Sequence, residues 1–291
     1  MSGNYNEKSK SKYVIFDLFG TILNDSFVND AQIIRNRVLN IDINPNESDK
    51  AKDTHYKVIQ KTIEESFYLP ENVNVKLTEN SDSIKLSKQD LKTTIQTFLF
   101  LLGFLYNLKN KDANNYLING SKEFLDYTKG KGYSNILLSN VICPIQDSLV
   151  SYYNLSIDFK ACQAMNLAED EKALKIFGNY HFKKVQILEE SSKHLNLEDV
   201  KAVVGDDLIK DGLVSLYLSV KYNKPVKFYH YVGEGSNKAA INYKLEDLIN
   251  TIKNSKFNDV LNVTDVEKTV KEWYSNNYEK FEKFEELHNK F

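Results

Sequence analysis

Carboxylates, hydroxyls and lysines in this sequence stand at or just after the ends of short apolar runs, where a parallel sheet presents side chains to a ligand. Asp17 follows the apolar run at residues 13–16, and Asp206 comes just after the run at residues 200–204. Carboxylates that converge from two strand ends repel each other unless a cation lies between them, and a few hard oxygen ligands suit Mg²⁺. Hydroxyls and ammonium groups at the same edge suit a bound phosphoryl group. The candidates for that role are Thr21, Ser139, Asn140, Lys183 and Lys184.

Strands and helices in alternation would position these side chains, and this order favours a parallel sheet covered on both faces. Apolar runs predict the strands, at residues 13–16, 136–138, 157–162, 200–204 and 226–231. Amphipathic spacing predicts helices between them, at residues 120–129, 183–195 and 245–252.

Residues 26–115 interrupt this alternation directly after the first strand, so we expect them to form an insertion. Their pattern predicts mostly helix, at residues 31–39, after Asp53 and at residues 91–106, with a polar loop at residues 72–83. The tail, residues 256–291, is helix-like and rich in aromatic residues. Such a stripe usually packs on its own domain, and a partner surface is the alternative.

The motifs in this order resemble the haloacid dehalogenase-like (HAD) superfamily. The family's first motif is an apolar strand followed by Asp-x-Asp-x-Thr, and residues 13–21 read YVIFDLFGT. Its second motif matches ILLS at residues 136–139, its third is a lysine before the fourth, and its fourth matches VVGDDLIKD at residues 203–211. The resemblance covers residues 13–24 and roughly 117–253 and implies an α/β fold, a Rossmann-like parallel sheet core with an inserted α-helical cap. The implied domains are a core at residues 1–24 and 117–255, a cap at 25–116 and a C-terminal helical extension at 256–291.

The resemblance also implies a role for each site residue. Asp17 would be the nucleophile that forms an aspartyl-phosphate, with Mg²⁺ as the cofactor. Spacing favours Lys183 over Lys184 as the motif lysine. The implied catalytic residues are Asp17, Thr21, Ser139 and Lys183. The implied substrate-binding residues are Gly20, Asn140 and Lys184. The implied metal ligands are Asp17, the main-chain carbonyl of Phe19, and Asp206, Asp207 and Asp211.

Phe19 departs from the family pattern, because it stands where family phosphatases have the aspartate that protonates the leaving alcohol. General acid–base help of that kind is worth about 10²–10⁴-fold in rate, and a phenylalanine cannot supply it. An Asp-x-aromatic-Gly-Thr motif also occurs in the haloacid dehalogenases, in which Asp17 would displace halide from carbon without Mg²⁺. These enzymes need a cation for the substrate carboxylate, and the two arginines of the chain are Arg35 and Arg37.

The expected function is Mg²⁺-dependent hydrolysis of a small phosphorylated metabolite. The alternatives are a 2-haloacid dehalogenase-like hydrolase and a weakly active or non-catalytic HAD-fold binding protein.

Composition limits the partners. The 291 residues include 38 Lys+Arg and 40 Asp+Glu, so the net charge of −2 provides no global positive field for nucleic acid. The most apolar run, residues 98–106, is shorter than the about 20 residues that span a bilayer, and no signal peptide is recognisable. Two cysteines, Cys143 and Cys162, do not make a disulfide framework, so we expect a reducing cytoplasm. A small-molecule substrate, rather than nucleic acid or a membrane, is the expected partner.

Overall fold

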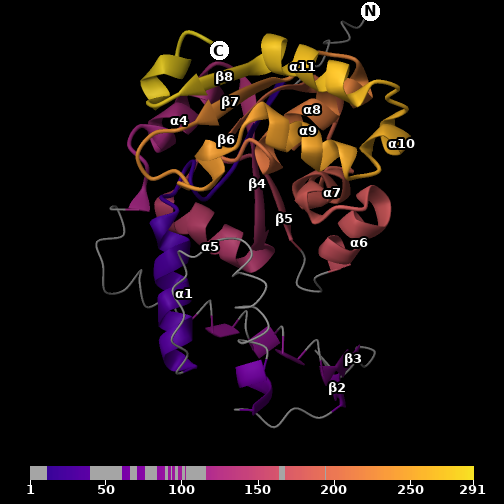
Figure 1. The fold of residues 1–291 in the computed structure, drawn as a ribbon. Helices are drawn as coiled ribbons and strands as arrows, with labels where there is room; N and C mark the ends of the chain where they lie inside the picture. The colour runs from indigo at the N-terminus through magenta and orange to yellow at the C-terminus, as the bar shows by residue number, and fades with distance from the viewer. Residues whose placement is uncertain are drawn as a thin grey trace, which may run out of the picture. The chain divides into compact units, whose positions relative to one another are not determined.

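Runs of β-branched and aromatic residues form a six-stranded sheet in the computed structural model (Figure 1). The structure describes residues 12–39, 61–65, 71–75, 84–88, 91–92, 94–95, 98–99, 102, 116–163, 168–193 and 195–291. The strands are β1 (Lys12–Phe16), β4 (Tyr133–Ile142), β5 (Phe159–Gln163), β6 (Val200–Gly205), β7 (Lys227–Tyr231) and β8 (Tyr278–Phe281). Their order is β5-β4-β1-β6-β7-β8, and every neighbouring pair is parallel. The predicted parallel sheet is therefore confirmed.

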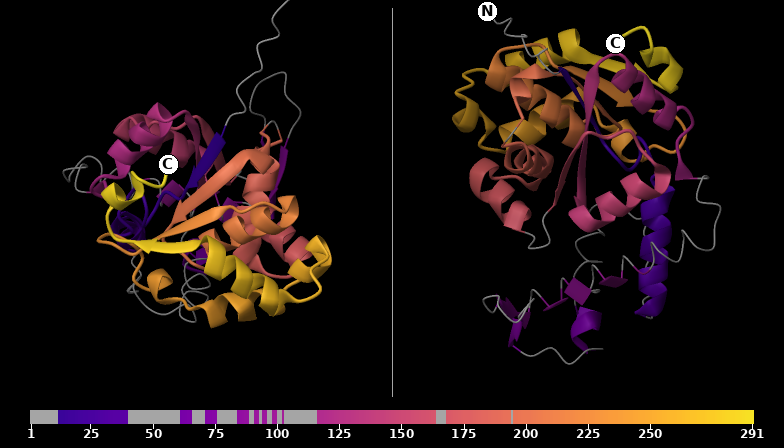
Figure 2. Two further views of the ribbon diagram at one scale, coloured as in Figure 1. Left: turned by 90° about the horizontal axis from the view of Figure 1, so that it is seen from above. Right: turned by 180° about the vertical axis from the view of Figure 1, so that it is seen from behind.

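Helices cover both faces of this sheet (Figure 2). They are α4 (Ser121–Gly130), α5 (Cys143–Tyr153), α6 (Ala168–Phe177), α7 (Lys183–Ser191), α8 (Lys210–Tyr222), α9 (Leu245–Lys253), α10 (Phe257–Leu261) and α11 (Val266–Asn277). Short 3₁₀ turns occur at Tyr180–Phe182, Leu197–Asp199, Ala240–Asn242 and Phe284–Leu287. Alternate residues of β1 point to opposite faces: Ile15 joins a core with α7, α8, α9 and α11, whereas the ring of Phe16 lies 6.1 Å from that of Phe124 in α4. Burial on both faces gives the Rossmann-like α/β class that the sequence predicted.

The chain divides into two units, Met1–Asp25 with Leu117–Phe291, and Ser26–Tyr116. The second unit contains α1 (Ser26–Val38), β2 (Asn72–Val75) and β3 (Ile84–Ser87), and β2 and β3 pair antiparallel. The described residues within 61–65 and 91–102 are helical, and the rest of the helices expected there lie outside the described residues. The prediction that residues 72–75 belong to a loop was wrong, because two valines alternate with two asparagines there, as in a strand.

The C-terminal segment is not wholly helical as predicted. After α10 and α11, β8 joins the sheet as its last strand and pairs with β7. Several aromatic side chains of this segment are buried on their own unit, with Trp273 4%, Phe281 3% and Phe284 1% exposed. These side chains pack on their own domain, as predicted.

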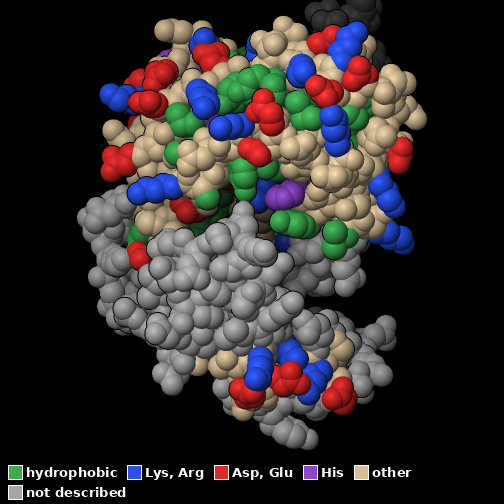
Figure 3. Space-filling model, in the orientation of Figure 1, with side chains coloured by type: hydrophobic (Ala, Val, Ile, Leu, Met, Phe, Trp, Pro, Cys, Tyr) green, Lys and Arg blue, Asp and Glu red, His purple; other side chains and the backbone are tan. Residues whose placement is uncertain are grey.

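Cys143 and Cys162 form a disulfide with a Cα–Cα distance of 5.1 Å, although 19 positions separate them in sequence. Cys143 begins α5, directly after β4, and Cys162 lies in β5, so the pairing of these two strands brings the cysteines together. The sequence-based expectation of a reducing cytoplasm rested on two cysteines being too few for a disulfide framework, and it did not anticipate this single bond. In the described part of the chain, no helix has the length and apolar character needed to cross a bilayer. Lysines and acidic residues are interspersed over the described part of the face in Figure 3.

Candidate functional site

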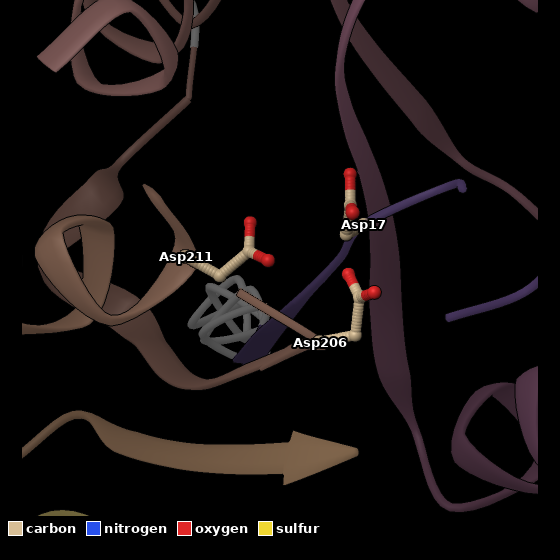
Figure 4. Close-up of side chains that lie close together, drawn as sticks. All are labelled: Asp17, Asp206 and Asp211. Atoms are coloured by element: carbon tan, nitrogen blue, oxygen red, sulfur yellow. The ribbon is translucent and has the colours of Figure 1, made fainter. Parts of the chain in front are cut away.

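Three buried carboxylates meet at the carboxyl end of the sheet. Asp17 follows β1, Asp206 follows β6, and Asp211 lies in the first turn of α8. Each offers an oxygen that lies within 4.8 Å of the others, and the side chains are directed toward a common region (Figure 4). The residues are 7%, 2% and 2% exposed. They converge because β1 and β6 are parallel neighbours whose ends lie at the same edge of the sheet.

Lys184 lies between two of these carboxylates. Its Nζ is 2.6 Å from Asp17 Oδ1 and 2.5 Å from Asp211 Oδ1, and the residue is 4% exposed. Burial by itself lowers the pKa of Lys184, but the two carboxylates together outweigh burial and raise its pKa, so this ammonium stays charged.

The preference for Lys183 as the motif lysine is corrected by this geometry. Lys183 is only half-buried, and the ion pairs with Asp17 and Asp211 come from Lys184. Successive residues of a helix point in directions about 100° apart, so one of two adjacent lysines in α7 can face the carboxylates. Residue spacing in the sequence does not give that rotation.

Gly20 lies against Asp206. It has a φ of +82°, and a Cβ atom there would be 1.9 Å from Asp206 Oδ2, so both the backbone conformation and the space require glycine. The same oxygen, Asp206 Oδ2, accepts a 2.7 Å hydrogen bond from the backbone N–H of Asn237. Asn237 was missed in the sequence, because a backbone donor in the loop after β7 has no residue-type signal.

Asp207 does not belong to the three-carboxylate group, in contrast to its predicted place among the metal ligands. Its Oδ1 accepts 2.9 Å hydrogen bonds from the backbone N–H groups of Ile209 and Lys210 at the start of α8. Its Oδ2 lies 3.2 Å from Lys210 Nζ. Asp207 therefore stabilises the beginning of the helix that carries Asp211.

Hydroxyl and amide groups lie at the neighbouring strand ends. β4 continues through Ser139 and Asn140 to Ile142, beyond the predicted end at residue 138, with an irregular register after Leu138. Ser139 Oγ accepts a 3.3 Å hydrogen bond from the backbone N–H of Val141. Thr21 Oγ1 and Asn140 Oδ1 are buried and have no hydrogen-bond partner among the described residues. A buried polar atom of this kind costs about 1–3 kcal/mol, which a ligand at the site would offset.

Phe19 is half-buried in the loop after β1, where it forms an isolated bridge with Leu23. Its side chain has no acidic group that could protonate a leaving alcohol. Metal binding by its main-chain carbonyl remains a prediction. Arg35 and Arg37 belong to α1, but their side chains lie outside what the structure describes.

The charges of the site favour a divalent cation. Among the described residues, the ion pairs to this group come from Lys184, and three carboxylates with one ammonium leave two negative charges unmatched when all are ionised. Burial, followed by the neighbouring carboxylates, raises the pKa of Asp206 well above its ordinary value. Burial is also the largest cause that raises the pKa of Asp211, to about 7. Carboxylate oxygens are the ligands that Mg²⁺ prefers, so the residues present fit that ion.

A buried histidine lies behind the carboxylates. His230 is fully buried, and its Nε2 lies 3.0 Å from the carbonyl oxygen of Asp206. Its Nδ1 lies 2.9 Å from the hydroxyl of Tyr278 in β8. Burial lowers the pKa of His230 to about 4, so the ring is neutral.

No protein-family model matches this sequence, and no curated protein matches it. Solved structures similar to the chain include a predicted phosphatase from Clostridium acetobutylicum, with 12% identity over 97% of this chain and 98% of that one and a TM-score of 0.49. A haloacid dehalogenase-like family hydrolase from Streptococcus pneumoniae has 11% identity over 80% and 90% of the two chains and a TM-score of 0.42. CbbY from Rhodobacter sphaeroides, in complex with phosphate, has 14% identity over 78% and 89% and a TM-score of 0.44. These TM-scores are below 0.5, so the assignment of function depends on the side chains of this chain.

Proposed function

We propose that this chain is a HAD-type hydrolase that catalyses Mg²⁺-dependent hydrolysis of a small phosphorylated metabolite. The observation that carries this proposal is the buried group of Asp17, Asp206 and Asp211 around Lys184 at the carboxyl end of a parallel sheet. Two unmatched negative charges suit a divalent cation, and an adjacent ammonium suits a phosphoryl oxygen. The order of the motifs along the chain supports the same family.

The chemistry begins with a carboxylate oxygen of Asp17. It attacks phosphorus as the bond from phosphorus to the leaving alkoxide breaks, which gives an aspartyl-phosphate and an alkoxide that takes a proton from solvent water to become the alcohol. A water molecule then attacks the same phosphorus, the bond to Asp17 breaks, and inorganic phosphate leaves. Lys184 donates to the phosphoryl oxygens, and its ion pair holds Asp17 in place.

The groups expected to contact the other phosphoryl oxygens are Thr21, Ser139 and Asn140. Thr21 Oγ1 has no hydrogen-bond partner in the part of the chain that the structure describes, so its hydroxyl is available to a ligand. Gly20 contributes through the space it leaves beside Asp206.

Asp17, Asp206 and Asp211 are the side chains that would hold Mg²⁺, together with the carbonyl of Phe19. When bound, the ion supplies positive charge that reduces the repulsion between an anionic nucleophile and an anionic substrate. The carboxylates of this chain hold it, and Lys184 provides the remaining positive charge.

A panel of phosphate esters and 2-haloacids, assayed with Mg²⁺ and with a chelator, tests this function. We expect the wild-type protein to release phosphate, and we expect both the chelator and Asp17→Asn to stop that release. Halide release that persists with the chelator would instead establish the dehalogenase alternative, which Phe19 favours.

Substitution of Phe19 tests whether the site lacks only an acid. We expect Phe19→Asp to raise the rate on alkyl phosphates by about 10²-fold, because an acid at this position can protonate the leaving oxygen. Phe19→Asn is the matched control, because it removes the ring without adding an acid. No gain in Phe19→Asp, together with no Mg²⁺ binding, would favour the non-catalytic binding protein.

A further inference from the structure

One peptide unit connects two members of the carboxylate group. The backbone N–H of Asp207 donates a 3.1 Å hydrogen bond to Asp211 Oδ2. The carbonyl on the other side of that peptide belongs to Asp206 and lies 3.0 Å from His230 Nε2. A rotation of this peptide would release Asp211 and shift Asp206 together, so its orientation controls both carboxylates.

The bond to the carbonyl defines which nitrogen of His230 carries the proton. A carbonyl oxygen can only accept, so Nε2 must donate, and in a neutral ring Nδ1 must then accept. The hydroxyl of Tyr278, 2.9 Å from Nδ1, is therefore the donor to the ring. Tyr278 thus holds the imidazole in the one tautomer that bonds to Asp206.

The sheet brings these residues together. His230 lies opposite Gly205, the residue before Asp206, in the pairing of β7 with β6. Tyr278 is the first residue of β8 and lies opposite Phe228, two positions before His230 and so on the same face of the sheet. Hydrogen bonds then run from the C-terminal strand through the imidazole and the peptide to Asp211, and from there through Lys184 to Asp17.

We propose that His230 and Tyr278 are positioning residues for the carboxylate group. Through Tyr278, the C-terminal strand β8 then helps to orient the side chains of the cation site. This inference rests on the proposed function, because it assigns Asp206 and Asp211 the task of binding Mg²⁺. The residues act through the Asp206–Asp207 peptide and do not themselves touch the cation or the substrate.

Calorimetric titration of Mg²⁺ into the purified full-length chain tests the proposal without relying on turnover. Tyr278→Phe removes only the hydroxyl and keeps the ring, so it is expected to fold. We expect it to weaken Mg²⁺ binding by about 10- to 100-fold, the usual effect of removing a group that orients a metal ligand. Tyr229→Phe is the matched control, since it removes a hydroxyl from β7 on the opposite face of the sheet, and its affinity for Mg²⁺ should equal that of the wild type.

Two substitutions of His230 separate positioning from packing. His230→Gln keeps an N–H that can donate to the carbonyl of Asp206, whereas His230→Leu does not. We expect the glutamine variant to bind Mg²⁺ more tightly than the leucine variant. A purely structural role would lower the melting temperature of both and leave the Mg²⁺ affinity of the folded protein unchanged.

Nitrogen NMR of the imidazole provides an independent measurement in the protein without Mg²⁺. We expect His230 to be protonated at Nε2 in the wild type, and to show an altered tautomer balance in Tyr278→Phe. Wild-type Mg²⁺ affinity in both Tyr278→Phe and His230→Leu, or an Nδ1–H tautomer in the wild type, would overturn the inference and leave the proposed function intact. A wild-type protein that binds no Mg²⁺ would overturn the metal site and this inference together.

Discussion

Around Asp17, buried carboxylates outnumber the cation that faces them, whereas around Phe124 the buried side chains are aromatic and contact one another. In the first region Lys184 is shared by Asp17 and Asp211, and no described residue forms a hydrogen bond with Thr21 Oγ1. In the second region, three phenylalanine rings lie within 6.1 Å of the ring of Phe124: they are Phe16, Phe284 and Phe291.

The two regions differ in their expected roles: the carboxylates around Asp17 bind a ligand, whereas the aromatic rings around Phe124 stabilise the fold. Burying unmatched charge destabilises a folded protein, so such a cluster persists where a ligand uses it. Burying aromatic rings against one another stabilises it. Substitutions should therefore have opposite effects on stability in the two regions, and only those in the first should alter ligand binding.

The aromatic region should show the largest loss of stability. Phe284→Ala removes a ring that is 1% exposed and contacts Phe124, Tyr231 and Phe281. We expect the free energy of unfolding to fall by about 3–5 kcal/mol, as for other buried phenylalanines. Urea unfolding measures it, and the Mg²⁺ affinity of the folded protein should not change. A loss of Mg²⁺ affinity would contradict the division between the two regions.

The carboxylate region should show the opposite sign. Asp206→Asn removes a carboxyl group that is buried unfavourably beside Asp17 and Asp211, and it keeps an oxygen to accept from the N–H of Asn237. Without Mg²⁺ we expect the free energy of unfolding to rise by about 1–2 kcal/mol. Mg²⁺ at 100 times its dissociation constant should stabilise the wild type by about 2.7 kcal/mol and this variant little. Thermal unfolding with and without Mg²⁺ measures the stability of the variant and the stabilisation by the ion. A variant less stable than the wild type without Mg²⁺ would contradict the view that the unmatched carboxylates destabilise the fold.

Two threonines extend the comparison, because both are fully buried and their hydrogen-bond partners among the described residues differ. Thr21 Oγ1 has none, whereas Thr128 Oγ1 donates a 2.8 Å hydrogen bond to Asn135 Oδ1. We expect Thr21→Val to raise the free energy of unfolding by about 1 kcal/mol and Thr128→Val to lower it by about 1–2 kcal/mol. Thr21→Val should also lower kcat/KM, and Thr128→Val should not. Equal destabilisation of the two variants would remove the distinction.

Exposed charges should have the smallest effect. Hydrogen bonds from Lys253 and Lys271 lower the pKa of Glu267 from 4.5 to about 2. A carboxyl group whose pKa is lower in the folded state stabilises the protein above its unfolded pKa, and this contribution is lost as the pH falls from 4.5 toward 2. The difference in unfolding free energy between the wild type and Glu267→Gln should be small at neutral pH, because the pair is screened by solvent, and should vanish in acid. A difference that grows as the pH falls would contradict this.

Local sequence was sufficient for five of the six strands of the sheet and for the carboxylates that follow β1 and β6, whereas β8 lies in a tail that was predicted to be helical. Apolar runs of β-forming residues predict strands that are buried on both faces. Because parallel strands end at the same edge of a sheet, the sequence also predicts that Asp17 and Asp206 lie close together. The alternation breaks after the first strand, and the second unit, Ser26–Tyr116, begins there. In contrast, β2 was missed, because its short alternation of valine and asparagine reads as a polar loop.

Only the tertiary structure decided the contacts that depend on rotation, register or distant backbone. The rotation of α7 selects Lys184 over Lys183, and strand pairing joins Cys143 to Cys162. The N–H of Asn237, and the hydroxyl of Tyr278 behind His230, reach the site from segments far along the chain. Residue type and spacing describe which groups a chain carries and in what order, but the distances between those groups arise when separate elements pack against a common sheet.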